Sequence, residues 1–444
     1  MLRKLFAGLV LWLFSSQSPA NLVIEITQGV EGALPIAIVP FGFSGQQGEP
    51  LHNVGDIIAA DLSRSGRFSP LPIGDMVARP TRSKEVDFRD WRAVNVDNLV
   101  IGHVEPNGPG GYLIKFRLYD VFRGEQITGF SVPTTERHLR STAHQIADII
   151  YETLTGEPGA FNTRIAYVTS VRESAGQNER GEPIWKEQVH LRVADSDGYE
   201  PQTLVASVDP LMSPAWSPDG RRIAYVSFER GRSSIWVQEL YTGRREKLTS
   251  FPGINGAPAW SPDGRYMALT LSKDGNPDIF VMDMARRSLR ALTRHWAIDT
   301  EPAWSPDGKH LLFTSDRGGT PQIYRIPVSG GEPERLTYEG GYNARASYSP
   351  DGSRITMVTR VNGDYRIGSL DTDNGSLQIL SDGTLDESPS FAPNGSMIIY
   401  ATRNGGKAVL AAVSTDGRIK QSLALQAGDV REPAWSPYNQ QKRN

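Results

Sequence analysis

The hydrophobic positions of residues 159–444 recur as short strands at a fixed spacing. The string PAWSPDG at residues 214–220 returns unchanged at 258–264 and 302–308, and weaker copies follow. The six copies begin at residues 214, 258, 302, 346, 389 and 433, which gives intervals of 44, 44, 44, 43 and 44 residues. Each copy is a strand that runs into a turn, which is Ser-Pro-Asp-Gly in the first four copies, and three further short strands separate one copy from the next. Four strands in about 44 residues are typical of one β-propeller blade.

The two ends of the repeat complement each other. Residues 165–168 (IAYV) match the return strand at 223–226, but no PAWSPDG strand precedes them. The last copy, at 433–437, is followed by only seven residues and so has no return strand. We therefore expect an all-β six-bladed β-propeller, closed by strand exchange between its termini, which removes open sheet edges. An open array of sheets is the alternative.

An aromatic residue stands at the same position of every copy. Because it recurs once per blade, we expect it to pack one blade against the next rather than to line an aromatic ligand cage. These aromatic residues are Trp216, Trp260, Trp304, Tyr348, Phe391 and Trp435.

Residues 21–158 show a different pattern, in which apolar strands alternate with helical stripes. Helices are expected from Val54 to a stop at Gly66 and from Arg137 to Thr155. The expected strands cover residues 36–39, 99–101, 112–119 and 126–132, the last two joined as a hairpin. This pattern predicts an α/β N-terminal domain with a mixed sheet, joined at residues 157–159 to the propeller.

The first twenty residues have the features of an export signal. Arg3 and Lys4 precede an apolar run at residues 5–14, and small residues occupy positions 18 and 20. We expect a signal peptide over residues 1–20, cleaved after Ala20. An uncleaved anchor is the alternative, but ten residues at ~1.5 Å each span only about half of a ~30 Å hydrocarbon core. The later apolar stretches are too short to cross a membrane, so we expect no direct membrane span. An exported protein without cysteine and without an anchor fits the periplasm, and we expect it to be a monomer.

Charge and composition exclude several classes of function. The net charge of −3 provides no positive field for nucleic acid, and the absence of cysteine excludes disulfides, thiol nucleophiles and Cys-bound metals. The chain has no Gly-x-Ser-x-Gly, no His-Glu-x-x-His and no P-loop. Its histidines form no i, i+4 pair, and His138 and His144, six residues apart on one helix, are expected at the surface. We therefore expect no catalytic residue, no metal and no cofactor.

A second class of function remains open at this point. Trp-Ser-Pro-Asp-Gly turns are also similar to those in the non-catalytic domain of prolyl-oligopeptidase-like serine peptidases. An exported propeller associated with a hydrolase or peptidase is therefore the alternative to a binding protein.

Propellers without catalytic residues usually bind partners at one mouth of the central channel. The residues just before each repeat enter the innermost strand, so their loops should meet at one mouth. Acidic residues there, including Asp299 and Asp386, outnumber Arg345 and Arg431, which predicts an acid-leaning rim for a partner with basic and hydrogen-bonding groups. A solvated rim without a partner is the alternative. The candidate binding residues are Met212, Asn255, Ala257, Thr300, Glu301, Arg345, Glu387 and Glu432.

The segment that follows the expected cleavage site alternates apolar and polar residues. Such a strand-like segment at a free end is suited to adding to the sheet edge of a partner, and the alternative is an edge strand of the N-terminal domain. One segment could do both, bound in one state and released in another. The candidate residues are Leu22, Val23, Ile24, Glu25 and Ile26.

Several strings together resemble the TolB family, the periplasmic component of the Tol-Pal envelope system of Gram-negative bacteria. They are PIAIVPF at 35–41, AADLSRSGRF at 59–68, GAFNTRIAYV at 159–168 and the PAWSPDG repeats. The resemblance implies a non-catalytic adaptor that supports outer-membrane integrity and its constriction during cell division.

The resemblance also implies two partners. The propeller mouth would bind the peptidoglycan-associated lipoprotein Pal, and residues 21–32 would bind the inner-membrane protein TolA. Ala257 and Thr300 match family positions at the Pal face, whereas Ile254 stands where a related member has a histidine. Other outer-membrane lipoproteins and toxin translocation segments are further candidate partners.

Overall fold

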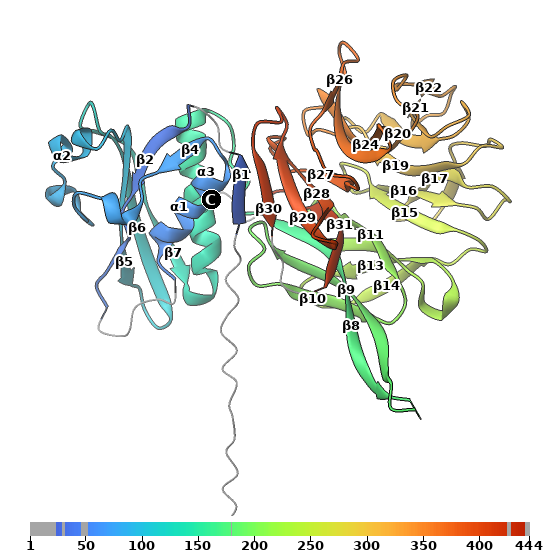
Figure 1. Cartoon of the computed structure of the whole chain (residues 1–444), viewed down its shortest axis with the longest axis horizontal. Helices are drawn as coiled ribbons and strands as arrows, with labels where there is room; N and C mark the ends of the chain where they lie inside the picture. Colours follow the sequence, from blue (N-terminus) through green and yellow to red (C-terminus); the bar gives the residue numbers. More distant parts are fainter. Residues whose placement is uncertain (1–23, 29–31, 46–51, 179, 424–427, 440–444) are drawn as a thin grey trace, which may run out of the picture.

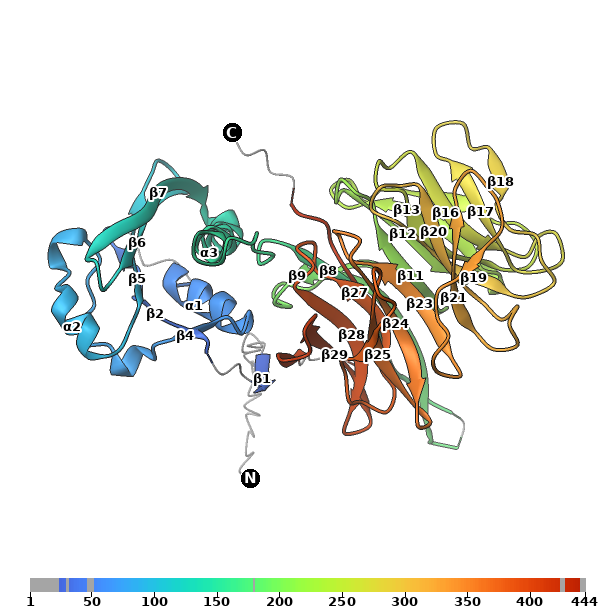
Figure 2. The ribbon, with the colours of Figure 1, turned by 90° about the horizontal axis from the view of Figure 1, so that it is seen from above.

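The computed structural model describes residues 24–28, 32–45, 52–178, 180–423 and 428–439. The expected signal peptide and the candidate residues Leu22 and Val23 lie outside these residues. None of the described helices has the length and apolarity needed to cross a membrane. Figure 1 shows an N-terminal α/β part beside a β-propeller, with the helices α1 and α3 between the N-terminal sheet and the propeller, as Figure 2 also shows.

The N-terminal sheet is mixed, as the sequence predicts. Its strand order is β4-β2-β5-β6-β7, with β3 also paired to β5; β2 runs parallel to β4 and β5, whereas β5, β6 and β7 are antiparallel. The strands are β2 (Leu34–Ile38), β3 (Gly42–Phe43), β4 (Phe68–Pro70), β5 (Asn98–Pro106), β6 (Gly111–Asp120) and β7 (Glu125–Thr135). The short β3 and β4 were not predicted, because two or three residues are too few to show a period.

Two helices cover the sheet face that is turned to the propeller. They are α1 (Val54–Arg64) and α3 (Leu139–Thr155), which share one core cluster with the sheet. Asn53 caps α1 by accepting a bond from the Gly55 N–H at 2.9 Å, and Gly156 ends α3 in the left-handed conformation at φ 77°. The chain before α3 forms the 3₁₀ turn η3 (Glu136–His138), so this helix begins two residues later than predicted.

The opposite sheet face carries shorter helical elements that the sequence pattern did not reveal. They are η1 (Ile73–Asp75), η2 (Ser83–Glu85) and α2 (Phe88–Ala93). Trp91 of α2 is fully buried in the core cluster on this face. A six-residue helix is shorter than two turns, so its apolar period is too short to recognise in a sequence.

From residue 164 onwards the described strands form six sheets, one per blade. Blades 1 and 2 contain β8 (Arg164–Gln177), β9 (Pro183–Asp195), β10 (Gln202–Ser207), β11 (Leu211–Trp216), β12 (Arg222–Ser227), β13 (Ser234–Glu239) and β14 (Arg245–Thr249), with the 3₁₀ turn η4 (Glu229–Gly231). Blades 3 and 4 contain β15 (Asn255–Trp260), β16 (Tyr266–Leu271), β17 (Asp278–Asp283), β18 (Leu289–Ala291), β19 (Asp299–Trp304), β20 (His310–Ser315), β21 (Gln322–Pro327) and β22 (Glu334–Arg335). Blades 5 and 6 contain β23 (Asn343–Tyr348), β24 (Arg354–Val361), β25 (Asp364–Asp371), β26 (Leu377–Ile379), β27 (Glu387–Phe391), β28 (Met397–Asn404), β29 (Lys407–Ser414) and β30 (Lys420–Leu423).

Blade 1 is completed by the C-terminal strand β31 (Asp429–Trp435). This strand pairs antiparallel with β8, with Trp435 opposite Ile165 and Ala434 opposite Ala166. The Ser436 N–H donates to the Arg164 carbonyl oxygen at 2.8 Å, which extends the pairing by one bond. The chain therefore joins its last strand to the first sheet of the propeller, in agreement with the predicted closure.

The residues of the repeat motif stabilise the turns and the contacts between blades, as the recurrence of the motif indicates. In the first turn Ser217 donates its hydroxyl to Asp219 at 2.5 Å, and Gly220 has a φ of 65°. The indole N–H of Trp216 donates to the Ala434 oxygen of blade 1, and Trp304 donates to the Ala259 oxygen of blade 3, both at 2.9 Å. The prediction that these aromatic residues pack between blades is confirmed.

The strand β1 (Ile24–Gln28) lies on the propeller rather than on the N-terminal sheet. It pairs antiparallel with β30, with Ile24 opposite Leu423 and Ile26 opposite Gln421, and so becomes the outermost strand of blade 6. Figure 1 shows β1 between the helices and β30. The alternative of an edge strand of the N-terminal domain is therefore wrong for these residues, because the free outer edge of blade 6 takes the strand instead.

Candidate functional site

One residue at the entry to each innermost strand has a left-handed backbone. In this part of the described chain the φ angles lie between 45° and 57°, and the pairing of the innermost strand shifts register at each of these positions. Such angles are unfavourable for residues with a side chain, and each bulge aims one side chain into the channel. We call these residues the channel ring: Ser213, Ala257, Glu301, Arg345, Ser388 and Glu432.

Arg345 joins the charged members of the channel ring. Its guanidinium donates to the Ser388 hydroxyl at 2.7 Å and to Glu432 at 3.2 Å, and its Nε lies 3.6 Å from Glu301. The Ser213 backbone N–H donates to the same Glu432 carboxylate at 2.5 Å. Burial lowers the pKa of Arg345, but Glu432 and then Glu301 raise it by more, so the net shift is upward. Two carboxylates against one guanidinium leave the ring with one negative charge.

The rest of the expected acidic rim is not at the surface. Asp299 is fully buried and accepts two bonds from the Arg317 guanidinium, at 2.7 and 2.9 Å. Asp386 is also fully buried and accepts from the Ser381 hydroxyl, and burial raises its pKa. The prediction of an acid-leaning rim is therefore wrong for these two carboxylates, since each is held inside the protein by its own partners.

The other candidate mouth residues differ in what they offer a partner. Met212 is exposed, whereas Thr300 and Glu387 are half-buried. Asn255 is fully buried, and its side-chain amide donates to the Phe251 oxygen at 2.7 Å and accepts from the Phe251 N–H at 3.0 Å. Asn255 therefore holds its loop in shape and is not accessible to a partner, which corrects its assignment as a binding residue.

The loops that enter the innermost strands lie on one face of the propeller. Leu211 pairs with Ser227 and Thr249 pairs with Ile235, so the entering loops lie at the same end of each blade as the hairpins between second and third strands. Large apolar side chains are exposed on these loops. We call this surface, with the channel ring at its centre, the docking face: Val208, Met212, Phe251, Ile254, Trp296, Ile298 and Tyr338.

Most of these exposed apolar residues were not predicted from the sequence. Of the apolar residues, Met212 was predicted from its place among the three residues before its motif, and Ile254 was named only through the family resemblance. The signal was present: residues 295–298 (HWAI) place two large apolar residues in a loop, where solvent favours polar ones. Trp296 is 76% exposed. Exposed apolar side chains that gather on one face are typical of a protein-binding surface.

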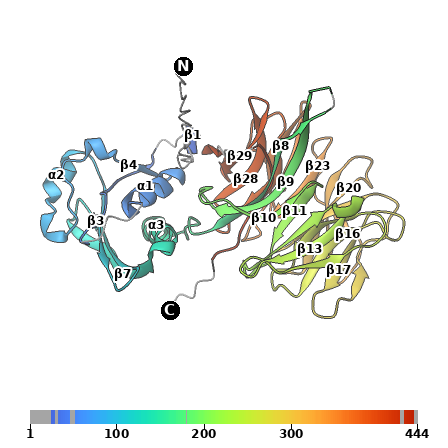
Figure 3. The ribbon, with the colours of Figure 1, turned by 90° about the horizontal axis from the view of Figure 1, so that it is seen from below.

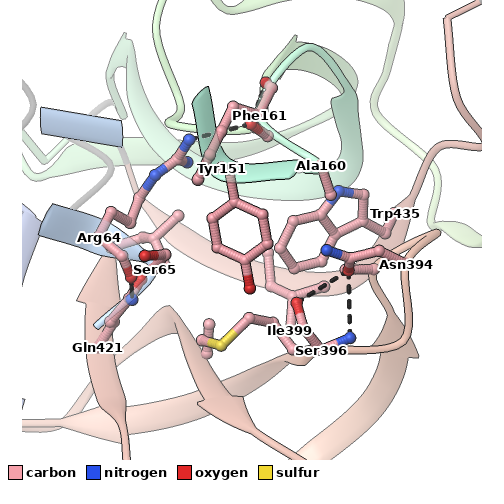
Figure 4. Close-up of a pocket in the computed structure, with 15 residues that line it drawn as sticks. Arg64, Ser65, Tyr151, Ala160, Phe161, Asn394, Ser396, Ile399, Gln421 and Trp435 are labelled. Atoms are coloured by element: carbon pink, nitrogen blue, oxygen red, sulfur yellow. Dashed lines mark hydrogen bonds between the residues drawn. The ribbon is translucent and has the colours of Figure 1, made fainter. Parts of the chain in front are cut away.

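A cavity lies at the junction of the N-terminal domain and blade 6. Figure 4 shows the Tyr151 ring pointing into it, with Arg64 on one side and Trp435 on the other. Gln421 of β30 donates its amide to the Arg64 oxygen, and Asn394 of blade 6 donates to the Pro158 oxygen at 2.9 Å. The cavity walls are thus the contact between domains, away from the docking face. Arg64 and Tyr151 come from α1 and α3, Trp435 from blade 1, and Asn394 and Gln421 from blade 6.

A buried cluster of charges joins the same two domains. His144 of α3 is 1% exposed, and its Nδ1 lies 2.6 Å from the Asp61 carboxylate of α1. Its Nε2 lies 3.8 Å from Asp197, in the β9–β10 turn of blade 1, and Arg140 donates to Asp197 at 2.5 Å. The prediction of a surface position for His144 is wrong, because the propeller covers this face of α3.

The carboxylates of this cluster are paired with basic side chains of the protein itself. Asp61, His144 and Asp197 are close enough together to ligate a metal ion, but the Arg140 guanidinium is already paired with Asp197. Burial lowers the pKa of His144, but the Asp61 carboxylate and then Asp197 raise it by more, so the net shift is upward. His144 lies between the Asp61 and Asp197 carboxylates and, with Arg140, links α3 to blade 1.

Asp148 of α3 holds the connection between the domains. Its carboxylate accepts the backbone N–H of Phe161 at 2.7 Å and that of Asn162 at 3.1 Å. Burial raises the pKa of Asp148 to about 7 despite these two bonds. Since the folded protein then holds a proton that the unfolded chain releases near pH 4, this group costs stability as pH rises from about 4 to 7.

We expect Asp148→Asn to remove this pH dependence. Between pH 5 and 7 the free energy of unfolding of the wild type should fall relative to that of the variant by roughly 1 kcal/mol per pH unit. The reason is that the buried Asp148 carboxyl of the wild type resists ionisation, whereas the amide of the variant does not ionise. Urea unfolding of both proteins at pH 5, 6, 7 and 8 measures this difference. A constant difference across the series would contradict the raised pKa.

Comparisons with known proteins agree along the whole chain. The family model of the TolB amino-terminal domain matches residues 22–127, and that of the TolB beta propeller domain matches residues 151–439. The chain is 56% identical over 439 residues, 99% of its length and 98% of the relative's, to the Tol-Pal system protein TolB of Thioalkalivibrio sulfidiphilus. It is 57% identical, over 97% of both chains, to that of Nitrosococcus oceani. The crystal structure of TolB from Acinetobacter baumannii matches 94% of this chain and all of its own, with a TM-score of 0.83 and 42% identity.

Proposed function

Because the chain belongs to the TolB family and is thus a component of the Tol-Pal system, we propose that it is a non-catalytic periplasmic adaptor that binds Pal through the propeller and TolA through its N-terminal segment. In this role it supports outer-membrane integrity and constriction of the outer membrane during cell division. The observation that carries the proposal is the docking face, where exposed apolar side chains surround a charged channel ring.

The docking face has the composition of a protein-binding site. Its apolar residues supply contact area, and the channel ring supplies one guanidinium and two carboxylates at the centre. Trp and Arg are the residues that most often dominate the binding energy of an interface. The N-terminal domain contacts blades 1 and 6 elsewhere, so this face is open to a partner.

We expect Trp296→Ser to weaken binding of Pal strongly. Loss of a large aromatic anchor of an interface costs about 2 kcal/mol or more, which corresponds to roughly a thirtyfold rise in Kd. The matched control is Tyr241→Ser, because Tyr241 is 73% exposed on the turn between β13 and β14, at the opposite end of its blade. Calorimetric titration with a Pal domain that lacks its lipid anchor measures both. Equal affinities for the two variants would contradict a Pal site on this face.

The position of β1 supports the proposed role of the N-terminal segment. Residues 24–28 add to β30 by backbone pairing, and backbone pairing of the same kind would let them add to a sheet edge of TolA instead. The edge of β1 that pairs with β30 can take only one partner strand at a time, so capture of that edge by TolA would require release from blade 6. The candidate residues in this strand are Ile24, Glu25 and Ile26, and the proposal extends to Leu22 and Val23.

We expect deletion of residues 21–32 from the mature chain to abolish retention of TolA and to leave Pal binding within about twofold. The deletion removes the proposed TolA strand but no residue of the docking face. Pull-down of each partner with the full mature chain and the deleted chain measures this. Retention of TolA by the deleted chain would place the TolA site elsewhere.

A further inference from the structure

Blade 1 carries a hairpin that is much longer than its counterparts. Strands β8 and β9 have 14 and 13 residues, whereas the second and third strands of blades 2, 3 and 4 have six each and those of blades 5 and 6 have eight each. Figure 1 and Figure 3 show this hairpin extending beyond the neighbouring strands. We call residues 171–188 the arm.

Among the residues that the structure describes, neither edge of the arm has a neighbouring strand. On one side β31 accompanies β8 only as far as Ser170, which pairs with Asp429. On the other side β10 accompanies β9 only as far as Val189, which pairs with Ser207. Among the described residues no other strand pairs with 171–177 or with 183–188. Their outward backbone groups are therefore available for an added strand.

The arm also exposes two large apolar side chains. Trp185 is 59% exposed and Ile184 is 42% exposed. Trp185 pairs with Ser174, so the residue directly across the ribbon is too small to cover the indole. Successive side chains alternate between the two faces of a strand, so Ile184 and Trp185 project from opposite faces of the arm. A strand added to the edge would meet both.

The arm projects from the docking face. The β8–β9 hairpin of blade 1 corresponds to the hairpins between second and third strands of the other blades, which lie at the docking-face end. The pairing of Asp429 with Ser170 places the base of the arm three residues along β31 from Glu432 of the channel ring. A protein seated over the channel ring therefore lies beside the arm.

The sequence of the arm has a net charge of −1. Its basic residues are Arg172, Arg180 and Lys186, and its acidic residues are Glu173, Glu179, Glu182 and Glu187, so the arm has no positive field to attract an anionic lipid surface or a nucleic acid. The arm can therefore recognise a partner through the unpaired backbone groups along its edges and through its exposed apolar side chains. These features suit a protein segment in extended conformation.

We propose that the arm is a second contact for the protein docked on the docking face, and that a free edge of the arm takes an extended segment of that protein as an added strand, anchored by Trp185. This inference rests on the proposed function, because it uses the partner seated at the channel ring. The recognition is by backbone pairing and apolar contact, so it depends little on salt.

The test uses an arm-shortened chain and a point variant with the anchor-free Pal domain as the probe. In the shortened chain an Asn-Gly turn replaces residues 173–186, which keeps the pair Arg172–Glu187. We expect the shortened chain and Trp185→Ser each to raise Kd at least tenfold, with Tyr241→Ser unchanged. Thermal unfolding of the shortened chain, within a few degrees of wild type, verifies that blade 1 is intact.

Hydrogen exchange distinguishes strand addition from side-chain contact alone. Bound Pal should slow amide exchange at least tenfold along residues 171–177 or 183–188, and unchanged exchange along both edges would overturn strand addition. Unchanged Kd in the shortened chain, together with weakened binding in Trp296→Ser, would overturn the role of the arm and leave the proposed function standing. Failure of the wild-type chain to bind Pal would instead overturn the proposed function.

Discussion

A chain that ends at Gly428 should fail to form a stable propeller. The truncation removes β31, so blade 1 loses its innermost strand and β8 gains an unpaired edge along residues 165–170. It also removes Val430, which is fully buried, and the Ala434 oxygen that accepts the Trp216 indole N–H. Full burial of one Val side chain contributes about 1.5–3 kcal/mol, and an unpaired buried donor costs about 1–3 kcal/mol. With the lost strand pairing, the sum approaches the ~5–15 kcal/mol that stabilise a folded domain.

The measurement is the yield of soluble monomer and its cooperative unfolding by heat. The truncated chain should aggregate through its open edges, whereas a chain that ends at Tyr438 keeps β31 and should match the wild type. A synthetic peptide of residues 429–438 should restore part of the soluble yield by pairing with β8. A soluble truncated chain that unfolds cooperatively near the wild-type temperature would show that closure contributes little.

His144→Ala should destabilise the protein by about 3 kcal/mol, the lower end of the cost of removing one partner of a buried ion pair, because each carboxylate keeps one cation. Asp61 loses its 2.6 Å contact with the ring but keeps Arg64 at 2.9 Å, and Asp197 keeps Arg140 at 2.5 Å. The variant also weakens the link between α3 and blade 1, so the two domains should unfold in separate calorimetric transitions. The control is His138→Ala, because His138 is exposed on the preceding turn and bonds only the Thr135 hydroxyl through its ring.

The effect of His144→Ala should depend on pH with a definite sign. The raised pKa of His144 means that its protonated form stabilises the fold fully below about pH 6.5, and this contribution is lost as pH rises through the folded pKa. The difference in unfolding free energy between wild type and variant should therefore be larger at pH 6 than at pH 9. A difference that grows toward pH 9 would show that the buried ring is neutral.

The limits of sequence reasoning are clearest at particular residues. Asn255 stands in a loop at the channel mouth and looked accessible, but its amide closes hydrogen bonds to its own loop. His144 lies on a helix whose covered face depends on how two domains meet. The burial of His144 has no local signature because it results from the packing of two domains, whereas the Asn255 contacts lie within its own loop and depend on a loop conformation that strand alternation does not specify.

The sequence by itself determined the repeat, the number of blades, the turn chemistry, the way the two ends complete blade 1 and the family. These follow from local patterns, because strand alternation, Gly and Pro at turns and a constant interval act within a few dozen residues. Only the tertiary structure decided which carboxylates face solvent, where β1 pairs, and that the exposed apolar loops gather around the channel ring beside the arm. These features depend on distances between segments far apart in the chain, which are set only when the blades and the N-terminal domain pack together.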